Sequence, residues 1–336
     1  MVKKFILVVT VFIIGFLSDC AGMKDGFNEP LEDAKDLDGS SAVEQISDYP
    51  FYWYSYPGDY GFDEYLKTGM MDDRQAVSFS QPHFACSCFA SFGNMGQAIF
   101  GRNFDWYFHP VMILFTQPSG GYRSVSMVDI SYLGYDDQNT PLDDPEALRY
   151  VPYLPFDGMN EMGFAAGMMS VAHAEGGDDP EKITIGSLEL MRLMLDHAAN
   201  VESALALIQD YNVDFDDIPI HYLIADREGN SAIIEYIHGE PVVIRNDKNW
   251  QVATNFLISE TSSSTAPNCW RYNLLEQELQ RFQGGLGEGK AMELLEKVSQ
   301  PGDFATRWSV LYDLEHGTIQ VAIGRHYHEV YRFSLN

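Results

Sequence analysis

Basic residues are scarce in this chain. Its 336 residues include 21 lysines and arginines against 49 aspartates and glutamates, which gives a formal net charge of −28. Neutralising nucleic-acid phosphates requires a basic surface, so the composition excludes a nucleic-acid partner. The acidity instead favours solubility and suits a neutral or cationic ligand. The chain also lacks an internal repeat, and its length allows one large buried core with appendages.

An apolar run long enough to cross a membrane comfortably is missing at the N-terminus. Lys3 and Lys4 precede an apolar stretch at 5–17, which is the pattern of an export signal. The residues around Asp19 and Cys20 resemble a bacterial lipoprotein box, although Asp19 stands where a small residue is expected. We expect an exported, extracytoplasmic protein. A lipid on Cys20, plain secretion and an uncleaved anchor all remain open.

Cysteine is rare as well. Of the four cysteines, Cys20 belongs to the signal, which leaves Cys86, Cys88 and Cys269. An exported chain normally pairs its cysteines, but three is an odd number, so at least one thiol is free. A Cys88–Cys269 bridge is compatible with this count, whereas a bridge that used Cys86 would remove the most informative thiol of the chain.

Cys86 stands out because of the charged residues that follow it. Arg102 comes sixteen residues later and Asp105 nineteen residues later. A hairpin that starts at Cys86 would bring both side chains back beside the thiol. A guanidinium near a cysteine favours the thiolate, which is the nucleophilic form. The spacing therefore predicts a cysteine nucleophile.

The chain divides into four parts. We expect a signal at 1–20, an acidic linker at 21–48, an aromatic-rich pro-segment at 49–85 that packs on the main domain, and a catalytic domain at 86–336. Within the last part, helices are expected at 186–200, 201–211, 268–282 and 290–298. Strands are expected at 98–100, 111–116, 123–130, 164–171, 220–226, 231–237, 241–245, 309–314, 318–323 and 329–333. Many strands with grouped helices indicate an α+β fold.

Three other sites match parts of the sequence. Cys88 with His221 suits a papain-like peptidase, but the papain signature needs one more residue between its two cysteines. A metal site at His83, Cys86 and Cys88 lacks a second ligand pair. The glycine-rich stretch 284–290 is similar to a phosphate-binding loop, but it follows an expected helix, and Ala291 replaces the Ser or Thr that holds magnesium.

The remaining interpretation needs no histidine base. Cleavage before Cys86 would give this residue a free α-amine, whose ordinary pKa is about 7.7–8.0. Such an amine can accept the thiol proton within the same residue and later return it to a leaving amine.

Five sequence blocks in order carry a family resemblance. They are Cys-Ser at 86–87, Gly-Arg-Asn-Phe-Asp-Trp at 101–106, Asp-Gly-Met-Asn-Glu-Met-Gly-Phe at 157–164, Ala-Thr-Asn at 253–255 with Cys-Trp-Arg-Tyr at 269–272, and Pro-Gly-Asp-Phe at 301–304 with Thr-Arg-Trp-Ser at 306–309. These blocks resemble those of the linear amide C–N hydrolases of the N-terminal nucleophile class, which include choloylglycine hydrolases, penicillin V acylases and penicillin-biosynthesis acyltransferases. The resemblance covers about residues 86–336.

The resemblance implies a four-layer αββα sandwich with two stacked antiparallel sheets. It also implies a reaction without a metal or an organic cofactor, in which Cys86 attacks a small-molecule, non-peptide amide through a thioester acyl-enzyme. In this scheme Arg102 favours and orients the thiolate, Asp105 holds the Cys86 α-amine, and Asn255 donates to the oxyanion. Arg307 would steady the site through charge-assisted hydrogen bonds.

Two departures qualify this comparison. Ser170 stands where the bile salt hydrolases commonly place an oxyanion-hole asparagine, and a long segment precedes Cys86. The second feature is closer to a processed precursor, activated by cleavage between Ala85 and Cys86. The chain gives neither half of the amide substrate, does not separate hydrolysis from acyl transfer, and does not give the oligomeric state. A non-catalytic exported binding protein on the same fold remains the alternative to an enzyme.

Overall fold

The computed structural model describes residues 42–69, 85–93, 97–215, 218–261 and 268–335. The predicted signal, Cys20 and His83 lie outside these residues. Within the described ranges, no helix is both long and apolar enough to cross a membrane.

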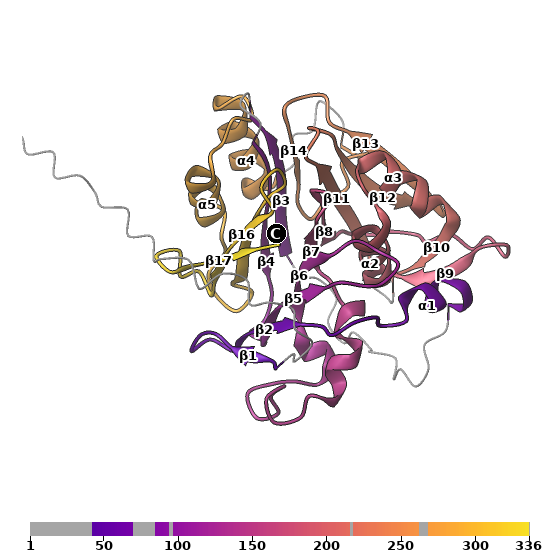
Figure 1. Ribbon diagram of the computed structural model, residues 1–336. Helices are drawn as coiled ribbons and strands as arrows, with labels where there is room; N and C mark the ends of the chain where they lie inside the picture. Colours follow the sequence, from indigo (N-terminus) through magenta and orange to yellow (C-terminus); the bar gives the residue numbers. More distant parts are fainter. Residues whose placement is uncertain (1–41, 70–84, 94–96, 216–217, 262–267, 336) are drawn as a thin grey trace, which may run out of the picture.

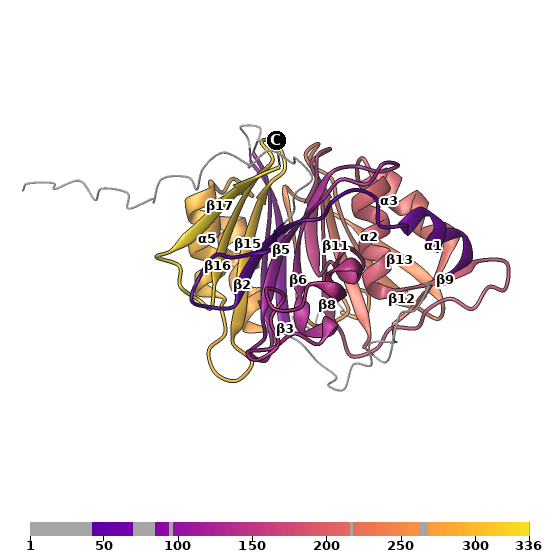
Figure 2. The ribbon, with the colours of Figure 1, turned by 60° about the horizontal axis from the view of Figure 1, so that its bottom comes forward.

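Two β-sheets stack face to face in the centre of the molecule, with helices on both outer sides (Figures 1 and 2). The larger sheet has nine strands, which lie in the order β1 (Glu44–Gln45), β2 (Phe51–Ser55), β5 (Val111–Thr116), β6 (Ser124–Asp129), β7 (Asp157–Asn160), β8 (Phe164–Ser170), β11 (Ile220–Asp226), β12 (Ser231–Ile237) and β13 (Glu240–Arg245). The smaller sheet has six, in the order β14 (Trp250–Ala253), β3 (Ala85–Phe92), β4 (Ala98–Asp105), β15 (Thr306–Asp313), β16 (Thr318–Ile323) and β17 (Val330–Ser334). Strands such as β5 and β11 are apolar almost throughout because both of their faces are covered.

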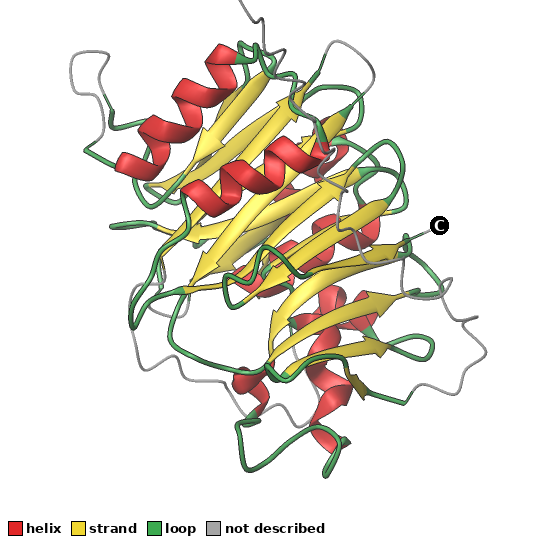
Figure 3. Ribbon diagram, turned by 90° about the vertical axis from the view of Figure 1, so that its left-hand side faces the viewer, coloured by secondary structure: helices red, strands yellow, loops and turns green. Residues whose placement is uncertain are grey.

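Two pairs of helices form the outer layers. Helices α2 (Ser187–His197) and α3 (Val201–Leu207) cover the nine-stranded sheet, and a capping box between Asn200 and Ser203 opens α3. Helices α4 (Trp270–Arg281) and α5 (Glu288–Lys297) cover the six-stranded sheet, and Figure 3 views the molecule from their side. Shorter elements are α1 (Phe62–Thr68), the parallel pair β9 (Ile183–Gly186) and β10 (Tyr211–Asp214), and the 3₁₀ turns η1 (Ile130–Leu133), η2 (Glu146–Tyr153) and η3 (Ile208–Asp210).

The predicted α+β sandwich of stacked sheets between helices is confirmed. The main sheets are antiparallel with one exception, since β2 pairs with β5 in parallel. The glycine-rich stretch 284–290 lies mainly in the connection between α4 and α5 and enters the first turn of α5. It therefore follows a helix, as the sequence predicted.

The hairpin expected after Cys86 is present as β3 and β4. In its register Cys86 lies opposite Phe104, Cys88 opposite Arg102, and Ala85 opposite Asp105. Gly101 lies opposite Phe89, where a Cβ atom would come within 2.4 Å of the phenyl ring, so the close approach of the two strands requires glycine.

The segment around β2 is part of the core. Phe51 is fully buried, and its ring lies 5.5 Å from that of Tyr331 on β17 of the other sheet. Further along, the Tyr60 hydroxyl donates a 2.5 Å hydrogen bond to Asp196 at the end of α2. Residues far upstream of Cys86 therefore join both sheets and a helix of the catalytic region.

This packing predicts that Phe51→Ala lowers the free energy of unfolding by about 3–5 kcal/mol, because truncating a buried Phe leaves a cavity. Urea denaturation measures this value. Glu44→Ala, at an exposed position on β1, is the control and should change it by less than about 0.5 kcal/mol. Equal stability of the two variants would contradict the placement of β2 in the core.

Candidate functional site

Cys86 lies near the start of β3 and is fully buried between the two sheets. Side chains alternate between the faces of a strand, so Cys86 and Cys88 point to the inter-sheet face, whereas Ala85 and Ser87 point to the helical layer of α4 and α5. On β4 the same alternation places Arg102 on the face of the thiols and Asp105 on the opposite face. The hairpin therefore distributes the predicted site residues over both sides of one sheet.

Arg102 reaches diagonally across the hairpin to the thiol. Its Nη2 atom lies 3.4 Å from Cys86 Sγ and donates to the Met168 carbonyl at 2.7 Å. Its Nη1 atom donates to the Phe156 carbonyl at 2.6 Å and to Asp157 at 2.5 Å. The guanidinium is thus held by Met168 of β8, by Asp157 at the start of β7 and by Phe156 just before it, all on the side of the nine-stranded sheet.

Asp157 holds Arg102 and is itself held by two further donors. Trp308 Nε1 donates to it at 2.9 Å, and the Tyr312 hydroxyl donates at 2.5 Å. Arg102 and Asp157 are both fully buried, and breaking a buried pair by removing one partner typically costs about 3–5 kcal/mol. Asp157 is the first residue of one block of the family resemblance, but nothing in the sequence pairs it with Arg102.

Burial raises the pKa of the Cys86 thiol; Arg102 and Arg271 lower it, Asp105 raises it, and the net pKa lies above the ordinary value. Arg102 therefore acts in the expected direction, toward the thiolate, but does not decide the net pKa of the intact chain. The guanidinium contact is present, but desolvation of the buried thiol outweighs it.

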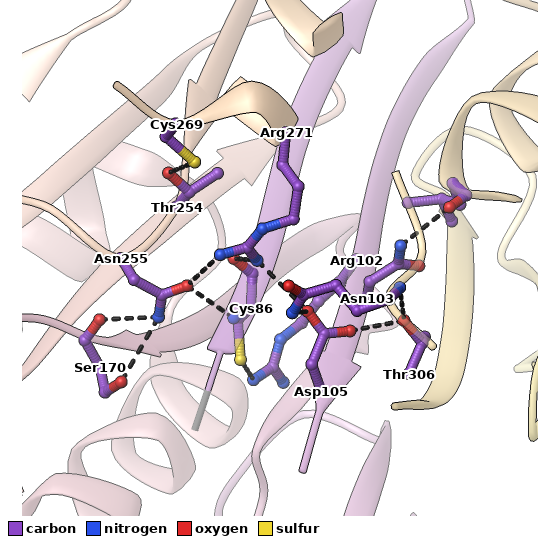
Figure 4. A network of polar contacts seen from close by, with 12 residues as sticks. Cys86, Arg102, Asn103, Asp105, Ser170, Thr254, Asn255, Cys269, Arg271 and Thr306 are labelled. Atoms are coloured by element: carbon purple, nitrogen blue, oxygen red, sulfur yellow. Dashed lines mark hydrogen bonds and ion pairs between the residues drawn. The ribbon is translucent and has the colours of Figure 1, made fainter. Parts of the chain in front are cut away.

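Asn255, two residues after β14, lies against the backbone of Cys86. Its Oδ1 atom accepts the Cys86 N–H at 2.8 Å. Its Nδ2 atom donates to the Ser170 carbonyl at 2.8 Å and lies 3.4 Å from the Ser170 hydroxyl. Asn255, the predicted oxyanion donor, therefore lies beside Cys86, and Ser170 lies beside Asn255 (Figure 4).

Arg271 connects Cys86, Asp105 and Asn255, and the sequence alone indicates no role for it. From the first turn of α4 its Nη1 atom donates to the Cys86 carbonyl at 2.5 Å and to Asp105 at 3.2 Å, while Nη2 donates to Asn255 Oδ1 at 2.9 Å. The block at 269–272 was the available signal. What the sequence could not show is that α4 lies over β3 and β14 with this residue pointing inward.

Asp105 is buried on the helical side of the sheet. It accepts hydrogen bonds from Gln300 at 2.6 Å and from Thr306 at 2.6 Å, in addition to the ion pair with Arg271. Burial raises its pKa to about 6, although Arg271, Thr306, Gln300 and Arg102 act in the opposite direction. No hydrogen bond joins Asp105 to the Cys86 nitrogen in the described part of this intact chain. In the hairpin Asp105 is the cross-strand partner of Ala85, the residue before the expected cleavage point.

Arg307 lies apart from this network. It donates to the Trp106 carbonyl at 2.7 Å and to the Asp303 carbonyl at 2.8 Å, and its side chain lies over the ring of Phe108. Arg307 is the extra residue of a β-bulge in β15, because Thr306 pairs with Asp105 whereas Trp308 pairs with the adjacent Phe104. The regular alternation of side chains is interrupted here, and Thr306 rather than Arg307 contacts Asp105. From the helical side of the six-stranded sheet, Cys86 is contacted by Arg271 and not by Arg307.

In the described part of the chain the other predicted contacts are not formed. Cys86, Cys88 and Cys269 are free, so the Cys88–Cys269 bridge is absent, and Cys269 instead accepts a hydrogen bond from Thr254. His221 contacts Thr254 and Glu235, and the stacked-sheet fold is not that of a papain-like peptidase. Among the residues that the structure describes, no three His, Cys, Asp or Glu side chains are grouped closely enough to bind a metal ion.

The pKa of Asp105 predicts a pH effect on stability. The unfolded carboxyl titrates near 3.8 and the folded one near 6, so between these values only the folded chain binds the proton. The contribution of Asp105 to stability therefore falls as the pH rises through this window. From pH 4 to pH 7 we expect a loss of about 2 kcal/mol.

Urea unfolding of Cys86→Ala, with and without Asp105→Asn, isolates this effect, because the Cys86 change prevents the expected cleavage. The difference in unfolding free energy between the two chains should fall as the pH rises. A difference that stays constant or grows from pH 4 to pH 7 would contradict the raised pKa.

Comparisons with known proteins agree with this geometry. Over 111 residues the chain is 32% identical to a penicillin V acylase of Pectobacterium atrosepticum, but this match spans only 30% of the chain and 29% of that protein. The penicillin V acylase structure of Agrobacterium tumefaciens is similar, with a TM-score of 0.57 and 19% identity over 74% of this chain and 86% of that one. A variant of the conjugated bile acid hydrolase from Clostridium perfringens gives a TM-score of 0.54 and 14% identity, covering 75% and 93%. At these identities the two structures show a shared fold.

The sequence profile of the linear amide C–N hydrolases, choloylglycine hydrolase family, matches residues 86–304. The match begins at Cys86 and contains Arg102, Asp105, Asn255 and Arg271. It covers about two thirds of the chain. The protein therefore belongs to the linear amide C–N hydrolases of the choloylglycine hydrolase family, whose members hydrolyse non-peptide linear amides.

Proposed function

We propose that this protein is an amidohydrolase in which Cys86, freed by cleavage of the chain before it, is the N-terminal nucleophile. The observation that supports this role most strongly is that three polar groups of Cys86 each have a dedicated partner. Arg102 lies at the sulfur, Asn255 accepts from the nitrogen, and Arg271 donates to the carbonyl oxygen. A merely structural cysteine needs none of these contacts.

The proposed reaction has two halves. In acylation the Cys86 α-amine takes the thiol proton, sulfur bonds to the substrate carbonyl carbon, and the C–N bond breaks as the amine leaves with that proton. In deacylation the α-amine takes a proton from water, the resulting hydroxide attacks the thioester carbon, and the C–S bond breaks. The sulfur then recovers the proton. The products are a carboxylic acid and an amine, and the enzyme is regenerated.

The neighbouring residues have distinct proposed roles. Asn255 Nδ2 donates to the oxyanion of the tetrahedral intermediate, a contact whose loss typically costs about 2.7–4 kcal/mol of barrier. Arg102 orients the sulfur. Asp105 holds the α-amine once Ala85 has left the position opposite it. Arg271 keeps Asn255 and Asp105 in place and neutralises the carboxylate.

Maturation is proposed to use the same groups. In the intact chain the nitrogen of Cys86 is an amide and cannot act as a base, and the thiol is fully buried. Attack of the Cys86 sulfur on the Ala85 carbonyl transfers the preceding chain from nitrogen to sulfur, and water then hydrolyses this thioester. The step releases a carboxylate at Ala85 and a free amine at Cys86. The upstream part of the chain, residues 1–85, acts as the signal, linker and pro-segment.

Substitution of the cysteines tests this function. Cys86→Ala should stay uncut and show no amidase activity, whereas Cys88→Ala, which changes the other thiol of the same strand face, should be cut and active. N-terminal sequencing of the wild type should start at Cys86. Full activity of a chain in which Ala85 is still joined to Cys86 would refute the proposal, and loss of activity only at Cys88 and His221 would favour a peptidase. Absence of amidase activity in every form would favour a binding protein.

The proposed substrate is a small linear amide with an apolar acyl group. Tyr107, two residues after Asp105, and Phe304, two residues before Thr306, are exposed, and their ring centroids lie 4.5 Å apart. These rings offer an apolar surface next to the site. Release of amine from a panel that includes phenoxyacetyl amides, conjugated bile acids and long-chain acyl amides identifies the acyl half.

We also propose that the chain is exported, on the evidence of Lys3, Lys4 and the apolar run that follows. Fractionation of the native host should place the protein outside the cytoplasm. Labelling with a radioactive fatty acid that is lost in Cys20→Ser would identify a lipid tether, and label-free secreted protein would favour plain secretion. Protein found in the cytoplasm with its N-terminus intact would contradict export.

A further inference from the structure

The segment that carries Asn255 is attached to the facing sheet at several points. It follows β14 of the six-stranded sheet, yet three adjacent strands of the nine-stranded sheet contact it. Ser170 at the end of β8 accepts from the Asn255 side chain. The other two contacts come from His221 on β11 and Glu235 on β12, which the catalytic scheme does not use.

His221 is bound to the residue before Asn255. Its Nε2 atom lies 2.6 Å from the Thr254 carbonyl, and because a carbonyl oxygen only accepts, Nε2 carries the proton and donates. The imidazole is fully buried, and its Nδ1 atom lies 3.5 Å from Glu235 Oε1. The carboxylate therefore stands at the opposite end of the ring from Thr254.

Glu235 is bound to residues that follow Asn255. Its carboxylate accepts the N–H of Ile258 at 2.6 Å and the N–H of Ser259 at 3.0 Å, and the side chain is fully buried. Burial raises the pKa of Glu235. The approach of His221 and the hydrogen bonds from Ser259 and Ile258 together lower the pKa by more than burial raises it, so the net pKa lies below the usual value. The buried carboxylate therefore stays ionised at neutral pH.

A buried imidazole next to a buried carboxylate is costly to place in a core. Desolvating such groups is unfavourable unless each is paired, and apolar residues of similar size are often at least as stable. Core stability alone therefore does not account for the pair. Its contacts meet on one short segment, with Thr254 on one side of Asn255 and Ile258 and Ser259 on the other.

We infer that His221 and Glu235 are positioning residues that fix the backbone around Asn255, so that its side chain meets Cys86. The inference rests on the proposed function of Cys86 and Asn255. Asn255 must keep Oδ1 within hydrogen-bonding distance of the Cys86 nitrogen and Nδ2 near the forming oxyanion. A displacement of about 1 Å at such a donor can reduce the rate about 100-fold.

Substitutions at His221 test the inference on the cleaved enzyme. His221→Leu fills the space without a donor, His221→Gln keeps an N–H near the position of Nε2, and His221→Asn keeps one only near Nδ1. The readout is kcat and KM per active site, with sites counted by alkylation of Cys86. We expect kcat to fall about 100-fold in His221→Leu and His221→Asn, with KM within about threefold of the wild type. His221→Gln should recover kcat to within about tenfold of the wild type.

His109→Leu is the matched control. His109 is the other buried histidine of the described chain and also faces a buried carboxylate, with Nε2 at 3.5 Å from Asp129. It has no hydrogen bond to the segment of Asn255 in the described structure. Its substitution should cost comparable stability but leave kcat per active site within about threefold of the wild type.

The outcomes separate the two proposals. If Cys86→Ala is inactive but folded His221→Leu keeps kcat within about threefold of the wild type, the positioning role is overturned. If His221→Leu does not fold, equal kcat values in His221→Asn and His221→Gln overturn it. If Cys86→Ala remains active, the proposed function itself fails, whatever the His221 variants show.

Discussion

The buried ion pair of Arg102 and Asp157 is the interaction on which the arrangement of the site depends. Arg102 belongs to the six-stranded sheet and Asp157 to the nine-stranded sheet, and both are fully buried. The facing sheet also supplies the carbonyl of Met168, with that of Phe156 from the residue just before β7, so the guanidinium fixes how the two sheets meet. Cys86 lies at this junction, and its sulfur meets the one guanidinium nitrogen that also binds Met168. The same guanidinium therefore joins the two sheets and contacts the thiol.

The alternation of side chains along β3 and β4 separates the proposed tasks. The sulfur of Cys86 and Arg102 point between the sheets, whereas Asp105 points to the helical layer and meets Arg271. The backbone of Cys86 lies between these two faces of the sheet. Asn255 and Arg271 contact this backbone at the nitrogen and at the carbonyl oxygen (Figure 4). An N-terminal nucleophile, in which backbone nitrogen and side chain act together, suits this geometry.

The sequence predicts those contacts that follow from short separations along the chain. A hairpin places Arg102, sixteen positions after Cys86, near the thiol without any knowledge of the fold, and the structure shows this contact. The link from Arg271 to Cys86 joins residues 185 positions apart and depends on how α4 packs. The pKa of Cys86 depends on burial, which spacing does not give. The sequence pointed to His221 only as a papain-like partner of Cys88 and did not point to Glu235, because their inferred role comes from three strands meeting one segment.

In the proposed mechanism the thiol of Cys86 carries the acyl group while its own nitrogen is free. Quenching the enzyme with acid during turnover, followed by peptide mass mapping, tests both parts at once. The account predicts a peptide that begins at Cys86, carries the substrate acyl mass and loses it in hydroxylamine, as a thioester does. An acyl group on any other residue, or on a peptide in which Ala85 precedes Cys86, would contradict it.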